Sequence, residues 1–126
     1  MLNKISEAGT LLQMVCHERA KTTGWWQNIY TGTAFDPRTK VPEKLMLIVS
    51  EVAEAMEGHR KGLMDEKLPH REMLEVELAD AVIRIFDLAG ALEFSLGAAI
   101  EEKLAYNASR KDHTIEHRKS SGGKLY

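Results

Sequence analysis

The chain has 126 residues, of which 44% are hydrophobic and 29% charged, with a formal net charge of −2. These values favour one folded domain over a disordered chain and give no reason to expect a nucleic-acid polymer as partner. No apolar run reaches membrane-spanning length, and the single cysteine, Cys16, fits a reducing compartment, so we expect a soluble cytoplasmic protein with no membrane partner.

The first predicted element is a helix from Leu2 to about Lys21, because its apolar residues recur at helical spacing. Gly24 suits the end of that helix, since glycine adopts a left-handed conformation at little cost. The next stretch, residues 25–42, has neither helical nor strand periodicity. Its aromatic residues predict an ordered loop instead of a free linker: Trp25, Trp26, Tyr30 and Phe35.

A second helix is expected to begin near Pro42, which suits a first helical turn, and to end near Gly62. One face of this helix is apolar and another carries carboxylates. A third helix, from about His70 to Leu92, is apolar nearly all round. Such a helix is expected to be central in the fold.

Ser95 suits the N-cap of a fourth helix, from Leu96 to about Lys111. The last residues are polar and contain Gly and Ser, which is typical of an arm or a tail. The sequence therefore predicts an all-α fold, a four-to-five-helix antiparallel bundle in one domain at residues 1–111, followed by a C-terminal tail at residues 112–126.

Two of the predicted helices each carry a pair of carboxylates three residues apart, Glu51 with Glu54 and Glu77 with Asp80. Residues three apart share one helix face. Each pair lies about eight residues from the intervening turn, roughly 12 Å along its helix, so an antiparallel hairpin brings the two pairs level. Carboxylates gathered there would repel one another without a cation, and oxygen ligands without His or Cys favour Mg²⁺ or Mn²⁺.

The same carboxylates also have a structural interpretation. Glutamate is common on solvated helix faces, and Arg84, one turn beyond Asp80, can form an internal salt bridge. The metal site is the favoured interpretation, because Glu77 and Asp80 lie on a helix too apolar to be exposed and buried acids are rare unless paired or metal-bound.

A second polar pattern, Lys103, Asn107 and Arg110, follows one face of the fourth helix. These cations can simply complement a helix C-terminus. Beside an acidic metal site, however, they would suit the oxygens of a polyphosphate. Trp25 and Trp26 have two evenly weighted interpretations, as core or interface anchors or as a platform on which a base stacks.

The order and spacing of these motifs, ExxE, ExxD and KxxxNxxR within residues 44–110, resemble the MazG-like branch of the all-α nucleoside triphosphate pyrophosphohydrolases. The ending NASRKDHTIEHRKSSGGKLY is similar to that of small single-domain members from phages and bacteria. The resemblance implies a helical bundle that assembles as dimers, or as tetramers built from dimers, with sites at or near subunit contacts. It also implies hydrolysis of an NTP or dNTP to the monophosphate and pyrophosphate. The expected location is the cytoplasm, or the host cytoplasm if a phage encodes the protein.

The resemblance further assigns roles to single residues. Glu54 would orient or deprotonate the attacking water, Lys103 and Arg110 would grip phosphates, and Asn107 would hydrogen-bond a phosphate or the sugar. The motifs assign no base pocket, for which Trp25, Trp26 and Asn28 are candidates on their chemistry alone. The resemblance also implies that Mg²⁺ or Mn²⁺ is bound, with more than one ion once the triphosphate is present. The metal ligands of the family correspond to Glu51, Glu54, Glu77 and Asp80.

Two other functions stay open from the sequence. One is the related phosphoribosyl-ATP pyrophosphohydrolase activity, and the other is a non-catalytic helical module that binds a nucleotide or a partner protein. A ferritin-like di-iron site is disfavoured, because that site expects Glu-x-x-His pairs and neither carboxylate pair here includes a histidine.

Overall fold

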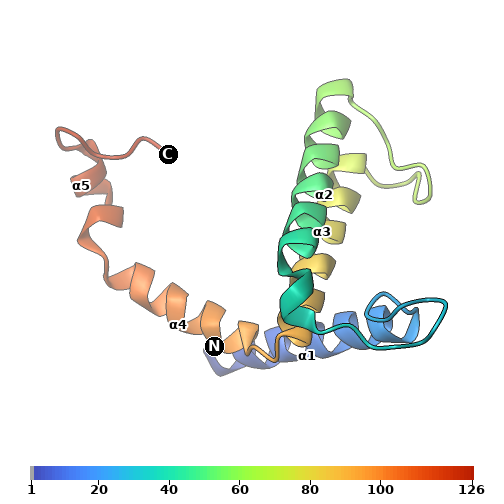
Figure 1. Ribbon diagram of the computed structural model, residues 1–126. Coiled ribbons are helices and arrows are strands. Elements are labelled where there is room, and N and C mark those ends of the chain that lie inside the picture. The colour runs from blue at the N-terminus through green and yellow to red at the C-terminus, as the bar shows by residue number, and fades with distance from the viewer. Residues whose placement is uncertain (1) are drawn as a thin grey trace.

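Five α-helices make up most of the chain in the computed structural model, which describes residues 2–126 (Figure 1). Two short 3₁₀ helices precede α2 and α5, at Pro37–Lys40 and Lys111–His113. Within residues 2–126 the strand-like pairing is limited to two isolated antiparallel bridges. The predicted all-α class is therefore confirmed. The helices are α1 (Leu2–Thr22), α2 (Val41–Lys61), α3 (Met73–Ala91), α4 (Leu96–Ser109) and α5 (Ile115–Lys119).

The helix boundaries follow the predicted start and stop signals, with one exception. Gly62 ends α2 in the left-handed conformation, with φ of 63°. The third helix, α3, begins at Met73, later than expected, because the residues before it form a closed turn. There Met64 pairs with Glu72, and the Asp65 side chain accepts hydrogen bonds from two backbone N–H groups. Local pairing thus replaces the first turn of the predicted helix.

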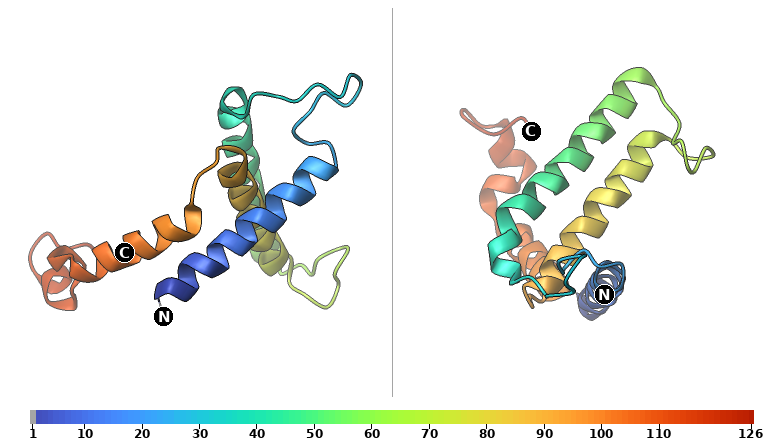
Figure 2. Two further views of the ribbon diagram at one scale, coloured as in Figure 1. Left: turned by 90° about the horizontal axis from the view of Figure 1, so that it is seen from below. Right: turned by 45° about the vertical axis from the view of Figure 1, so that its right-hand side comes forward.

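Helices α2 and α3 form an antiparallel hairpin, and α1 crosses α3 near the end of α3 that is remote from the hairpin turn (Figures 1 and 2). The fourth helix packs on α1 at a very close approach. A Cβ atom on Gly9 would lie 2.3 Å from the Cα atom of Gly97, so only glycine fits at this contact. Gln13 of α1 strengthens the α1–α4 contact, because its side-chain oxygen accepts a hydrogen bond from the Leu96 N–H at 3.0 Å. Leu96 is the first residue of α4, and Ser95 occupies the predicted N-cap position.

The single chain does not close into a compact bundle. The principal helix contacts are α2 with α3, α1 with α4 and α1 with α3, and α4 leads away from the hairpin and carries α5 with it (Figure 1). The prediction that α3 is central holds for its last turns, where Phe86, Leu88 and Ala89 are buried. Large apolar side chains on the remaining faces stay exposed, among them Leu11, Met14, Leu45, Val49, Val52, Met56, Leu78, Val82 and Ile85.

Local pairing and capping occur in the segments outside the long helices. The loop between α1 and α2 is closed by a bridge between Gln27 and Ala34 and anchored by the buried Trp26, as predicted for an ordered loop. The predicted tail contains the short helix α5, where the Thr114 side chain caps the N-terminus by accepting a hydrogen bond from the His117 N–H. Among residues 2–126, no helix has both the length and the apolar character needed to span a membrane.

Candidate metal centre and adjoining groove

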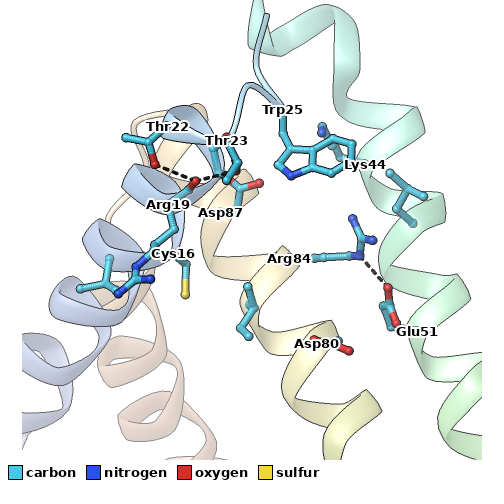
Figure 3. Close-up of a pocket in the computed structure, with 14 residues that line it drawn as sticks. Cys16, Arg19, Thr22, Thr23, Trp25, Lys44, Glu51, Asp80, Arg84 and Asp87 are labelled. Carbon is cyan, nitrogen blue, oxygen red and sulfur yellow. Dashed lines mark hydrogen bonds and ion pairs between the residues drawn. The ribbon is translucent and has the colours of Figure 1, made fainter. Parts of the chain in front are cut away.

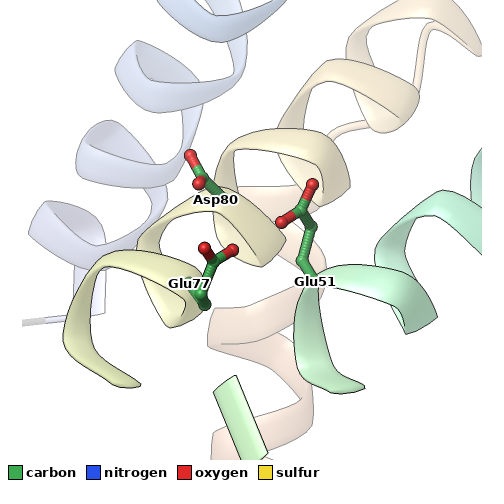
Figure 4. Close-up of side chains that lie close together, drawn as sticks. All are labelled: Glu51, Glu77 and Asp80. Atoms are coloured by element: carbon green, nitrogen blue, oxygen red, sulfur yellow. The ribbon is translucent and has the colours of Figure 1, made fainter. Parts of the chain in front are cut away.

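Three of the four predicted carboxylates converge between α2 and α3. Glu51 comes from α2, and Glu77 and Asp80 come from α3 (Figure 4). One carboxylate oxygen of each residue lies within 4.8 Å of the others. The antiparallel hairpin thus brings the two helix faces level, as their equal distances from the turn predicted. We call these three residues the carboxylate cluster.

The carboxylate cluster contains a buried oxygen with no partner. Glu51 and Glu77 are only 9% and 8% exposed, and Glu77 Oε2 has no hydrogen-bond partner among the described residues. A buried polar atom without a partner is costly, and a carboxylate more so. This atom therefore marks a place where a proton or a cation has to be supplied.

The electrostatics of the cluster agree with its geometry. Burial, together with the neighbouring Glu51 and Glu54, raises the pKa of Glu77 to about 8. Burial and the charge of Glu51 also raise the pKa of Asp80. Burial acts to raise the pKa of Glu51 as well, but hydrogen bonding with Glu77 and Arg84 outweighs it, so this pKa lies below its ordinary value. Near neutral pH Glu77 keeps a proton that a divalent cation would displace.

Glu54, the predicted catalytic carboxylate, lies at the exposed edge of the cluster. It is not one of the three residues whose oxygens converge, but it is close enough to contribute to the raised pKa of Glu77. Its side chain is exposed, whereas Glu51 and Glu77 are buried. Glu54 is thus placed where it can meet an incoming ligand or water.

Arg84 pairs with a carboxylate on the other helix of the hairpin. Its Nε donates a hydrogen bond to Glu51 Oε1 at 2.9 Å, whereas no ion pair joins Arg84 to Asp80 in the described part of the chain. The structural alternative from the sequence, a salt bridge within α3, is therefore replaced by a bridge between α3 and α2. The Arg84 side chain remains 40% exposed.

A groove of about 890 Å³ adjoins the cluster, between α1, α2, α3 and the start of the loop (Figure 3). Glu51 and Asp80 belong both to the cluster and to the groove wall. Three cationic side chains line the groove, Arg19, Lys44 and Arg84, alongside an apolar wall. The sequence did not predict Arg19 or Lys44 here, because helical periodicity gives the faces of α1 and α2 but not the angle at which α1 crosses the hairpin.

The two tryptophans have different environments. Trp25 is 67% exposed and lines the groove, so it keeps its place as a candidate platform for a base. Trp26 is 7% exposed, and its Nε1 donates a hydrogen bond to Asp87 Oδ1 at 2.8 Å. The Lys44 ammonium lies 4.5 Å from the centre of its ring system. Trp26 is therefore a core anchor, which is one of its two predicted roles.

Asn28 and Asp87 order the surroundings of the groove. Asn28 Oδ1 accepts hydrogen bonds from the backbone N–H groups of Tyr30 and Thr31 at 2.9 and 3.1 Å, and Asn28 does not line the groove. Asp87 Oδ1 also lies 2.9 Å from His17 Nδ1, so one buried carboxylate joins α1, the loop and α3. Helical periodicity places Asp87 on α3 but does not show that His17 and Trp26 are its partners.

The predicted phosphate-binding strip lies apart from the carboxylate cluster within one chain. Lys103, Asn107 and Arg110 lie on or just beyond α4 and do not line the groove. Arg110 donates two hydrogen bonds to the Asp112 carboxylate, at 3.1 and 2.7 Å, and Lys103 Nζ lies 4.8 Å from the ring centre of Tyr106. Asn107 Oδ1 is buried without a partner among the described residues. The open arrangement of α4 separates this strip from the hairpin.

Comparisons of this chain with models of protein families, with curated proteins and with solved structures find no match. Membership of the MazG-like branch therefore stays a prediction from the motifs. The case for a function rests on the carboxylate cluster, the orphan oxygen of Glu77 and the cationic groove beside them.

Proposed function

We propose that this protein is a metal-dependent nucleotide pyrophosphohydrolase, which converts a nucleoside or deoxynucleoside triphosphate into the monophosphate and pyrophosphate. The observation that carries the proposal is the buried, unpartnered Oε2 of Glu77 within three convergent carboxylates. That cluster opens on a groove with three cationic side chains, a combination that suits a cation together with a polyanionic ligand. The motif resemblance to the MazG-like enzymes supports the same chemistry.

The donor set fits a hard divalent cation. Glu51, Glu77 and Asp80 offer only carboxylate oxygens, which Mg²⁺ and Mn²⁺ prefer. When bound there, the ion would neutralise phosphate charge and lower the pKa of a bound water. Glu77 would give up its proton on binding, and Glu51 would exchange its hydrogen bond with Arg84 for the ion.

The proposed role of Glu54 follows from its exposed position. A carboxylate at the edge of the cluster can accept a proton from a water held there and can orient that water toward a phosphorus atom in the groove. Trp25, exposed on the groove wall, would stack on the base and so hold the nucleotide in one orientation. The cluster residues and Trp25 thus define the two ends of the proposed substrate site.

We expect the active form to be a homo-oligomer. The chain exposes 9710 Å² of surface, whereas a compact monomer of 14.2 kDa exposes about 6,800 Å². The excess is about 2,900 Å² per chain, which is enough to supply the roughly 2,000–5,000 Å² that the two subunits of an obligate dimer bury together. In such an assembly the Lys103, Asn107 and Arg110 strip of one copy would reach the carboxylate cluster of another, which is how it would take up its predicted phosphate contacts.

The direct test is pyrophosphate release from a panel of common NTPs and dNTPs with Mg²⁺ or Mn²⁺, with EDTA as the control. We expect metal-dependent release with a monophosphate product, and loss of release in Glu54→Gln and Asp80→Asn variants whose helical circular dichroism is unchanged. Glu75→Gln, on the exposed side of α3, is the matched control. Silence across the panel from folded wild-type protein would contradict the proposed reaction.

A further inference from the structure

We propose that the groove binds the phosphate chain of its ligand through Arg84, Lys44 and Arg19, and that Arg84 couples this binding to the carboxylate cluster by leaving Glu51. The inference rests on the proposed function only for the class of ligand, a polyphosphate. It places the phosphate contacts on the hairpin and α1 of the same chain. These contacts would act together with those that the motifs assign to α4, which a second copy of the chain would supply.

The position of Arg84 carries the argument. Its Nε is hydrogen-bonded to Glu51 at 2.9 Å, and its two Nη groups have no hydrogen-bond partner among residues 2–126. In Figure 3 the Arg84 side chain extends from α3 across the groove toward α2, with Trp25 and Lys44 nearby. A guanidinium donates through five N–H bonds in a planar fork that matches a phosphate group. Arg84 therefore holds unused donors that face the groove.

Lys44 and Arg19 complete a cationic lining. Neither forms an ion pair with an acidic side chain in the described part of the chain; the Lys44 ammonium instead lies over the Trp26 ring at 4.5 Å. Several cations outside the groove differ from them, because an acidic side chain nearby in the chain pairs with each. Lys61 and Arg71, for example, are neutralised by Glu57 and Glu75 one helical turn away. Arg19 and Lys44 thus have no carboxylate partner, whereas Arg84 is paired with Glu51, which lines the same groove with Asp80 and Asp87. A divalent cation on the carboxylates would leave all three cationic side chains free for a polyanion.

Glu51 links this lining to the cluster. Glu51 can pair with Arg84 or bind a divalent cation, and a cation would supply the charge that Arg84 now supplies. The Arg84 side chain is 40% exposed and that of Glu51 12%, so the guanidinium end of this ion pair is open to solvent and to an incoming phosphate. Once released, Arg84 pairs with a phosphate oxygen. Cation binding at the cluster and phosphate binding in the groove therefore favour each other, and this coupling is reciprocal.

The first test is binding of inorganic tripolyphosphate with Mg²⁺, measured by isothermal titration calorimetry, since this probe carries the phosphates without a base or a cleavable nucleotide. Arg84→Gln is expected to weaken binding by about tenfold, the loss of one or two charge-assisted hydrogen bonds. Lys44→Gln is expected to weaken it less. Arg71→Gln and Lys61→Gln, which remove paired cations outside the groove, serve as matched controls and should bind as the wild type does.

The second test is Mn²⁺ binding without phosphate, followed by electron paramagnetic resonance. Because Arg84 competes for Glu51, Arg84→Gln is expected to bind Mn²⁺ more tightly than the wild type. Arg84→Lys keeps the positive charge without the planar guanidinium, so its Mn²⁺ affinity should lie between those of the wild type and Arg84→Gln. This variant preserves the test if Arg84→Gln does not fold. Weaker or unchanged Mn²⁺ binding in both variants would overturn the coupling.

These outcomes separate the inference from the proposed reaction. If no nucleotide is hydrolysed but tripolyphosphate binding depends on Arg84, the reaction is wrong and the anion groove stands. If pyrophosphate is released but Arg84→Gln binds tripolyphosphate as the wild type does, the groove assignment is wrong and the reaction stands. Phosphate affinity that falls as protein concentration rises would show that a second copy of the chain occupies the groove, and would also overturn the assignment.

Discussion

Glu77 has the most unusual environment of the three residues in the carboxylate cluster. It is 8% exposed, one of its oxygens has no partner among the described residues, and burial with two neighbouring carboxyl groups raises its pKa to about 8. An exposed glutamate in an ordinary solubilising pair would show none of these features. A carboxyl group held in this way stays neutral near pH 7 until a cation replaces its proton.

The raised pKa of Glu77 predicts how stability depends on pH. The pKa rises from an ordinary 4.5 to about 8 on folding, so the folded state binds the proton more tightly than the unfolded state does. The stability contributed by this proton is complete below about pH 4.5 and is lost as pH rises through about 8. In EDTA, the wild-type melting temperature should therefore fall over this range, and Mn²⁺ should restore it most strongly at the alkaline end.

Thermal melts followed by circular dichroism check this prediction. Glu77→Gln is the informative variant, because its amide also donates a hydrogen bond but does not ionise. It should show a smaller decline with pH than the wild type in EDTA. Parallel pH profiles for the two proteins would show that Glu77 does not carry the effect.

Among the elements, the α2–α3 hairpin could be predicted almost completely from the sequence. Pro42 and Gly62 set the limits of α2, and equal distances from the turn placed the Glu51 and Glu54 pair level with the Glu77 and Asp80 pair. The places of Arg19 and Lys44 on the groove wall could not be predicted in this way. They depend on the angle at which α1 crosses α3, where Gly90 lies so close to His17 that a Cβ atom on Gly90 would be 2.5 Å from the His17 Cβ atom. A repeating pattern within one helix does not record contacts between helices.

Asp87 joins α1, the loop and α3, so its removal should lower the stability of the fold. Asp87→Ala would leave the Trp26 indole N–H buried without an acceptor, and would also remove the partner of His17. We expect a loss of about 1–3 kcal/mol in the free energy of unfolding, measured by urea titration. Asp87→Asn keeps an acceptor oxygen and should lose less. Equal stability of the alanine variant and the wild type would contradict the structural role of Asp87.

At the scale of the whole molecule, the uncovered apolar faces follow a regular pattern. Exposed residues on α2 recur at four- and three-residue spacing, and those on α3 do the same. This is the spacing of a helix-packing seam. A second hairpin laid on this surface would complete a four-helix bundle that one chain does not form alone. The seam residues are Leu45, Val49, Val52 and Met56 on α2 and Leu78, Val82 and Ile85 on α3.

The seam predicts the oligomeric state in solution. Sedimentation velocity of the wild type should show a dimer or a larger assembly, because the chain exposes about 2,900 Å² more surface than a compact monomer of its mass. Val49→Glu or Val52→Glu should shift the protein toward the monomer by placing a charge in the seam. Ala53→Glu, on an exposed face beside the seam, is the matched control. A monomeric wild type at micromolar concentration would contradict this prediction.

Mn²⁺ binding to the wild type and to Asp80→Asn, followed by electron paramagnetic resonance, shows most directly whether the carboxylate cluster holds a metal ion. The carboxylate cluster predicts saturable binding in the wild type, loss of at least tenfold in affinity in Asp80→Asn, since a ligand charge is removed, and no change in the control Glu75→Gln. Saturable binding that is equally strong in Asp80→Asn, or no binding in the wild type, would show that Glu51, Glu77 and Asp80 do not form a metal centre.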